Sequence, residues 1–161
     1  MSFSAGDPSR NPSSHPVFSY ADHVAERWQD VILLVGRWAV GWIYMQSGLR
    51  KLQDLEAFAK SMPGRQGLPE FMAYIAAPVE FIGGAAILLG LATRYAALVM
   101  LVFTLVASFS SHAWWTYPAA QQMQQFTQFW KNTTMKGALI LLFVTAAGRY
   151  SVDALLRRRA S

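Results

Sequence analysis

The chain has no cysteine among its 161 residues, and it has only three histidines. Without cysteine there can be no thiol catalysis, disulfide bond, cysteine-ligated iron–sulfur cluster, c-type haem attachment or cysteine-based zinc site. His15 and His23 lie in a polar N-terminal region, so His112 alone is near an apolar segment and a haem held by two histidines is excluded. We expect no metal site and no covalent cofactor, so a redox role would need a bound organic molecule or a partner protein.

Charged residues are also scarce, at 14% of the chain, whereas 53% of it is hydrophobic. The net charge of +5 would permit nucleic-acid binding, but the basic residues are scattered apart from a run at 157–159, so we expect no nucleic-acid partner. The sequence has no P-loop, nucleophile elbow or dinucleotide-binding glycine motif, because the glycines of GGAAILLG lie inside an apolar segment and indicate helix packing. The composition favours a membrane protein.

Four long apolar segments dominate the sequence, over residues 31–49, 71–91, 95–113 and 133–148. A helix needs about 20 apolar residues to cross a bilayer, so the first three are long enough and the fourth depends on its flanks. Tryptophans stand where apolar sequence meets polar sequence, as is typical of a membrane interface: Trp28, Trp114, Trp115 and Trp130. A soluble bundle is the alternative, but helices apolar on every side are unusual in so small a domain. We expect an all-α, multi-pass membrane protein, an antiparallel bundle of four transmembrane helices over residues 31–156.

The segments outside the predicted spans are polar. Residues 1–30 form a polar tail without the apolar core of a signal peptide, and residues 157–161 form a basic C-terminal tail. Residues of about 50–61 alternate as an amphipathic helix that we expect on the membrane surface, until the glycines and prolines of MPGRQGLPE break it. We expect the glutamine-rich segment 116–132 to be a wet connection, with a binding lid as the alternative.

Four spans place both termini on one side of the membrane. The second and third spans are separated by residues 92–94, which predicts a tight hairpin. Lys and Arg residues near the spans are equally numerous on the two sides, so their number does not determine the orientation of the protein by the positive-inside rule. The three terminal arginines and the short connection around Arg94 favour cytoplasmic termini.

Four ionisable residues fall inside or at the ends of the predicted spans: Arg37, Glu80, His112 and Lys136. Charge is costly in a bilayer, so each is expected either to pair or to function. Two pairings of Glu80 remain open. Arg37 could reach it from one face of the membrane, whereas Lys51, His112 and Lys136 lie at or just inside the opposite face.

The first span has a predicted interior face. Five of its residues follow steps of four and three, which places them on one side of a helix: Arg37, Gly41, Tyr44, Gly48 and Lys51. Such a mixture is unsuited to lipid, so this side should face the bundle, and its glycines would allow another helix to approach closely. Gly83 and Gly84 form a similar small-residue surface just after Glu80.

These residues support two interpretations. In the first, Glu80 neutralises one or two cations and keeps the helices in register. In the second, the outward half of the bundle holds a polar pocket, where Glu80 and His112 handle protons while Lys51, Lys136, Tyr44 or Gln46 bind a carbonyl group or an anion. His112 would also suit a merely interfacial position beside the neighbouring tryptophans. No residue receives a catalytic assignment.

Three motifs, in this order, carry a family resemblance. SGLRKL closes the first span, Glu80 is followed by Gly83, Gly84 and LLGLATR, and FWKN leads into the fourth span before GRYSVDALL. Over roughly residues 31–156 the chain resembles the DoxX family, which includes the DoxD-type small subunit of thiosulfate:quinone oxidoreductase. The resemblance implies a four-helix bacterial-type inner-membrane protein associated with oxidoreductases, quinone-linked in DoxD-like members. It does not imply thiosulfate as substrate, and only Lys51 and Glu80 carry over, as motif positions.

Three functions remain open. The first is an accessory subunit of a membrane oxidoreductase complex, with a quinone or small substrate bound near Glu80 and Lys51. The second is a non-catalytic anchor or assembly subunit of a larger complex, held through its loop aromatics and arginine tail. The third is a small-solute transporter, for which four helices would have to form a homo-oligomer, although no internal repeat supports it. Whether the chain is itself an enzyme stays open.

Overall fold

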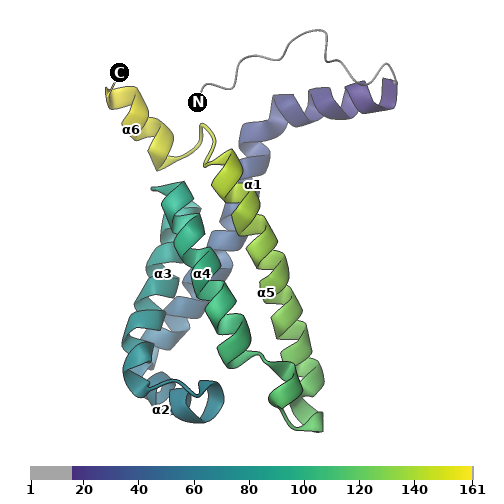
Figure 1. Ribbon diagram of the computed structural model, residues 1–161. Coiled ribbons are helices and arrows are strands. Elements are labelled where there is room, and N and C mark those ends of the chain that lie inside the picture. The colour runs from purple at the N-terminus through teal and green to yellow at the C-terminus, as the bar shows by residue number, and fades with distance from the viewer. Residues whose placement is uncertain (1–15, 161) are drawn as a thin grey trace.

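The computed structural model describes residues 16–160, and every regular element in this range is a helix. The α-helices are α1 (Pro16–Gln53), α2 (Leu55–Gln66), α3 (Ala73–Leu89), α4 (Thr93–Ser111), α5 (Ala119–Thr145) and α6 (Val152–Ala160). Two short 3-10 helices, η2 (Glu70–Met72) and η3 (Trp114–Thr116), precede α3 and α5. Figure 1 shows how the six α-helices are arranged. The predicted all-α class is therefore confirmed for the described residues.

Two helical segments are long and apolar enough to cross a membrane, Glu70–Leu89 and Thr93–Thr116, each with a mean hydropathy of 1.8. Only 28% of either segment is buried inside the protein. Ile82, Val102 and Phe109, for example, point large apolar side chains outward. The buried positions meanwhile include arginine, glutamate, threonine and serine side chains. This distribution suits an apolar solvent, because lipid solvates the outer face and polar groups must be satisfied inside.

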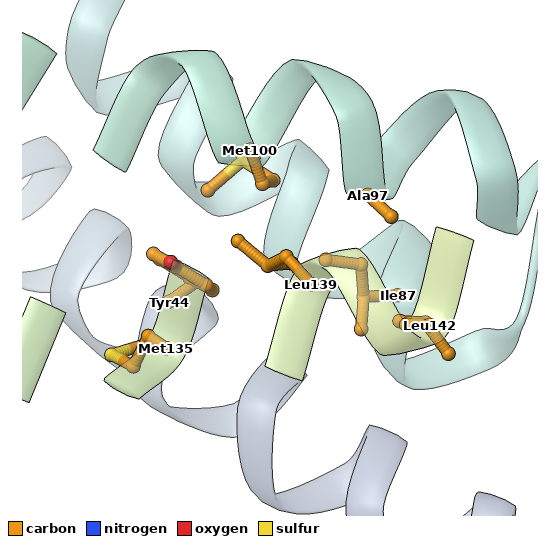
Figure 2. Packing of buried hydrophobic residues seen from close by; sticks show 7 residues of the cluster. All are labelled: Tyr44, Ile87, Ala97, Met100, Met135, Leu139 and Leu142. Atoms are coloured by element: carbon orange, nitrogen blue, oxygen red, sulfur yellow. The ribbon is translucent and has the colours of Figure 1, made fainter. Parts of the chain in front are cut away.

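The helices pack as two pairs, α1 with α3 and α4 with α5, joined where α3 meets α4. Seven apolar side chains from these four helices form the buried core, among them Ile87, Met100 and Leu139 (Figure 2). The turn between α3 and α4 is tight, because Gly90 and Ala92 both adopt left-handed backbone conformations. The predicted short hairpin is thus present.

Close contact between α1 and α3 depends on glycine. A Cβ atom at Gly41 would meet the Gly84 carbonyl and Leu88, and a Cβ atom at Gly48 would meet the backbone of Phe81. Gly83 faces Met100 of α4 instead. The two helices therefore approach backbone to backbone, as small residues permit in membrane proteins.

The polar half of α1 is helical as well. Its 38 residues correspond to about 57 Å of helix, well beyond the roughly 30 Å of a bilayer's hydrocarbon core. Figure 1 shows the first part of α1 turning away from the axis of the rest. The described part of the polar tail, from Pro16 onward, is thus a helix that continues into the first predicted span.

One expectation about the connecting segments is wrong, and another differs from the structure in its bounds. The glutamine-rich segment was expected as a connection, but α5 begins at Ala119 and includes most of it, since glutamine, alanine and methionine favour helix. The surface helix begins at Leu55, where Asp54 accepts a hydrogen bond from the Ala57 N–H, and it continues past Pro63 to a left-handed Gly67. Pro63 has no N–H, so the helix lacks one i→i−4 hydrogen bond at this position.

Candidate functional site

Glu80 and Lys51 form an ion pair between α3 and α1. Lys51 Nζ donates to Glu80 Oε2, and the side chains are 29% and 7% exposed respectively. Glu80 is placed by the middle of α3, whereas Lys51 stands in the last turn of α1, with its Nζ 5.3 Å from the centre of the Phe58 ring. A buried carboxylate is costly unless it is paired, and Lys51 supplies that pair across the two helices.

The alternative pairing of Glu80 with Arg37 is wrong. Arg37 is buried near the middle of α1, and its Nη2 donates to the Tyr150 carbonyl at 2.7 Å. Gly90 leaves the space that the guanidinium occupies, because a Cβ atom there would collide with it. Arg37 therefore joins α1 to the segment before α6 and takes no part in the Glu80 site.

A polar cavity of about 130 Å³ lies beside the ion pair. It is lined by side chains of α1, α3, α4 and α5 and by His112, the residue that ends α4. Hydroxyl, amino, carboxylate, amide and imidazole groups stand among apolar side chains. The lining residues are Ile43, Tyr44, Ser47, Lys51, Glu80, Phe103, Thr104, Ala107, Ser111, His112, Lys131, Asn132 and Met135. Its walls thus combine one carboxylate with two ammonium groups.

One wall of the cavity is a fixed hydroxyl chain. The Tyr44 hydroxyl lies 2.5 Å from Thr104 Oγ1, and Thr104 Oγ1 donates to the Met100 carbonyl at 2.6 Å. Because the single hydroxyl proton of Thr104 is used in that bond, Tyr44 is the donor to Thr104. Both side chains are almost fully buried, so this wall is rigid and Tyr44 is held between α1 and α4.

His112 lies at the end of α4, where it lines the cavity. Its Nδ1 is 2.8 Å from Gln125 Oε1, and an amide oxygen only accepts, so the proton is on Nδ1. Gln125 is buried and comes from the half of α5 that was expected as a connection. The glutamine-rich helix thus positions the imidazole.

Not every candidate residue reaches the cavity. Lys136 does not line it, and its Nζ lies 5.5 Å from the centre of the Phe129 ring. Lys131 and Asn132 line it instead, and neither was predicted to lie in the pocket. Both belong to the FWKN motif, which is the sequence signal that points to them.

An apolar groove of about 300 Å³ adjoins the polar cavity. It runs between α2, α3 and α4 and is lined mainly by aliphatic side chains and methionine, including Met62, Val79 and Val102. The groove and the polar cavity share four residues: Lys51, Phe103, Ala107 and Ser111. Together they form a site that is polar at one end and apolar at the other.

The opposite end of the bundle is held by Asp153 at the start of α6. Its carboxylate accepts from the Ala92 and Thr93 N–H groups, at 2.6 Å and 2.9 Å, and so caps α4. Burial raises the pKa of Asp153, but these hydrogen bonds and the charge of Arg157 outweigh burial and leave the pKa below its ordinary value.

Within residues 16–160 no group of three or more His, Cys, Asp or Glu side chains could hold a metal ion.

Comparison with known proteins matches the sequence model of the DoxX family to residues 32–113. The matched region holds the α1, α3 and α4 walls of the cavity, and it ends before α5. No solved structure matches the chain.

Two Escherichia coli proteins are similar over most of this chain. "Inner membrane protein YqjF" is 33% identical over 134 residues, which cover 83% of this chain and 98% of that protein. "Inner membrane protein YphA" is 30% identical over 135 residues, or 83% and 95% of the two chains. A Bacillus subtilis protein named "Putative oxidoreductase CatD" is 40% identical over 75 residues, or 47% and 54% of the two chains.

Proposed function

This chain belongs to the DoxX family of inner-membrane proteins, and on that premise we propose that it is an accessory subunit of a membrane oxidoreductase system. We propose further that it binds a quinone between the polar cavity and the apolar groove. The printed name of the Bacillus subtilis relative supports the oxidoreductase association.

The proposed membrane arrangement has four spans. Besides α3 and α4, the later parts of α1 and α5 expose apolar side chains such as Val35 and Trp38 on one and Leu141 and Val144 on the other. All four parts bury residues against one another in a single core. The arginines of α6 and Arg94 lie at the end of the bundle that we assign to the cytoplasm.

The observation that carries the quinone proposal is the shared wall of the two cavities. A quinone has a carbonyl-bearing head and an apolar tail, so it needs hydrogen-bond donors beside an apolar channel. Lys51 and Ser111 supply donors where the groove meets the cavity, and the groove offers about 300 Å³ of apolar space. The residues present therefore fit such a molecule.

A bound quinone supplies two-electron, two-proton chemistry. The chain contributes positioned proton carriers and donors. Lys51 can donate to a carbonyl oxygen while Glu80 stabilises its charge, and His112, oriented by Gln125, stands on the same cavity for proton exchange. Tyr44 donates to Thr104 and shapes the wall.

Purification in mild detergent, with mass spectrometry of proteins and lipids, tests this proposal. We expect a quinone and an oxidoreductase partner to copurify with the protein. Glu80→Gln should then abolish turnover of the complex while the protein stays inserted and assembled. Unchanged turnover would refute a role of the cavity in the reaction.

A non-catalytic anchoring role is the second candidate, and an exposed aromatic surface on α5 favours it. Met123 is 74% exposed and Trp130 is 51% exposed, and the Trp130 ring packs against the exposed Phe126. Such a surface suits contact with a partner protein. If anchoring is the whole function, replacing residues 121–128 would release the partner, while Glu80→Gln would change neither assembly nor turnover.

A further inference from the structure

A second cavity lies at the opposite end of the bundle, between the end of α5 and the start of α6. Its volume is about 380 Å³, and it is lined by residues 145–149 together with Ser151, Ala154 and Arg157. Figure 1 shows this junction at the end where α5 finishes and α6 begins. The Lys51–Glu80 pair has no part in it, since neither residue lines it.

The cavity wall carries two positive charges and no carboxylate of its own. Arg149 and Arg157 contribute guanidinium groups to its wall, and no carboxylate lines it. Asp153 is engaged by the N–H groups that begin α4. Asp30 accepts from the backbone N–H of Arg149 at 2.7 Å, and its other oxygen forms a long ion pair with Arg149 Nε at 3.6 Å, so Asp30 engages Nε alone of the guanidinium nitrogens. A guanidinium has five donors, so both arginines can still bind an anion.

Apolar side chains flank these cations. On the last two turns of α5, Leu141 and Val144 are 67% and 66% exposed, and on α6 Leu155 and Leu156 are 58% and 52% exposed. A free inorganic anion would gain nothing from this surface, whereas a molecule with a phosphate and acyl chains would use both parts.

We infer that this cavity binds the phosphate of an anionic phospholipid. Arg149 and Arg157 hold the phosphate oxygens, and the acyl chains run along the Leu141 and Val144 surface of α5. A lipid bound in this way connects α5 to α6 at the point where Arg37 and Asp153 already hold the C-terminal segment to the bundle.

Native mass spectrometry of the full-length protein tests the inference, with phosphatidylglycerol, phosphatidylcholine and free glycerol phosphate as probes. The wild type should retain phosphatidylglycerol in preference to the other two. Arg149→Gln with Arg157→Gln should weaken phosphatidylglycerol binding at least tenfold, at a few-fold for each arginine. Arg149→Lys with Arg157→Lys should restore much of it, because the charge returns.

The matched control is Arg94→Gln with Arg159→Gln, which removes the same charge at the same end from residues that do not line the cavity. This control should lose much less binding than the Arg149 and Arg157 pair. Equal losses in the two double variants would overturn the inference and leave only a diffuse electrostatic attraction. If the cavity variant does not fold, the wild-type protein still provides a test. Retention of phosphatidylcholine or of free glycerol phosphate equal to that of phosphatidylglycerol would also overturn the inference.

Discussion

Replacing Lys51 by methionine should leave Glu80 as a buried carboxylate without its cation. Removing one partner of a buried ion pair costs about 3–5 kcal/mol, and the partial exposure of Lys51 places this pair near the lower limit. At about 3 kcal/mol, the midpoint of thermal unfolding should fall by roughly 6–12 °C for a chain of this size. Tryptophan fluorescence in detergent can follow the transition, since the chain has six tryptophans.

The double variant Lys51→Met with Glu80→Leu provides the control. It removes both charges, and an apolar pair of similar volume can replace a buried ion pair at little cost, so we expect its unfolding midpoint close to that of the wild type. Arg50→Gln removes a neighbouring exposed cation and should have little effect. If the double variant were as unstable as Lys51→Met, the two side chains would not be energetically coupled and the reasoning would be refuted.

Three further outcomes can be checked by the same unfolding assay. Gly84→Val should cost more than 2 kcal/mol, since its side chain would enter the Tyr44 Cβ and α1 backbone, whereas Gly64→Ala, with nothing within 4 Å, should be tolerated. Thr104→Val should cost about 1–3 kcal/mol by leaving the buried Tyr44 hydroxyl without its acceptor, and an unchanged midpoint would contradict that bond. The lowered pKa of Asp153 stabilises the fold above the unfolded pKa of about 3.9, and this gain is lost as the pH falls through the folded pKa. The difference between wild type and Asp153→Asn should therefore shrink below about pH 4, and a constant difference down to pH 3 would argue against it.

The interior of α1 could be predicted from the sequence because helical periodicity alone decides which residues share a side. Arg37, Gly41, Tyr44 and Gly48, spaced by four and three, are the buried residues of α1 among those described, and Lys51 is half-buried. A membrane strengthens this prediction, because it is costly to place charged side chains in hydrocarbon and because glycines allow close packing between helices.

The partners of these residues could not be predicted in the same way. Arg37 donates to the backbone carbonyl of Tyr150, and carbonyls carry no sequence signal. Lys131 and Asn132 reach the cavity only because α5 starts at Ala119 and runs as one helix into the core. A polar, glutamine-rich segment resembles a connection, although its glutamines and alanines favour helix, and the contact between Gln125 and His112 carries no sequence signal.

Binding of a short-chain quinone to the purified protein, followed by quenching of tryptophan fluorescence, tests the central claim most directly. We predict saturable binding that weakens at least tenfold in Lys51→Gln, which removes a donor, and in Ala107→Phe, which fills the wall shared by cavity and groove. Arg50→Gln should bind like the wild type. Equal affinity in all four proteins, or no saturable binding by the wild type, would contradict a quinone site at the Lys51–Glu80 pair.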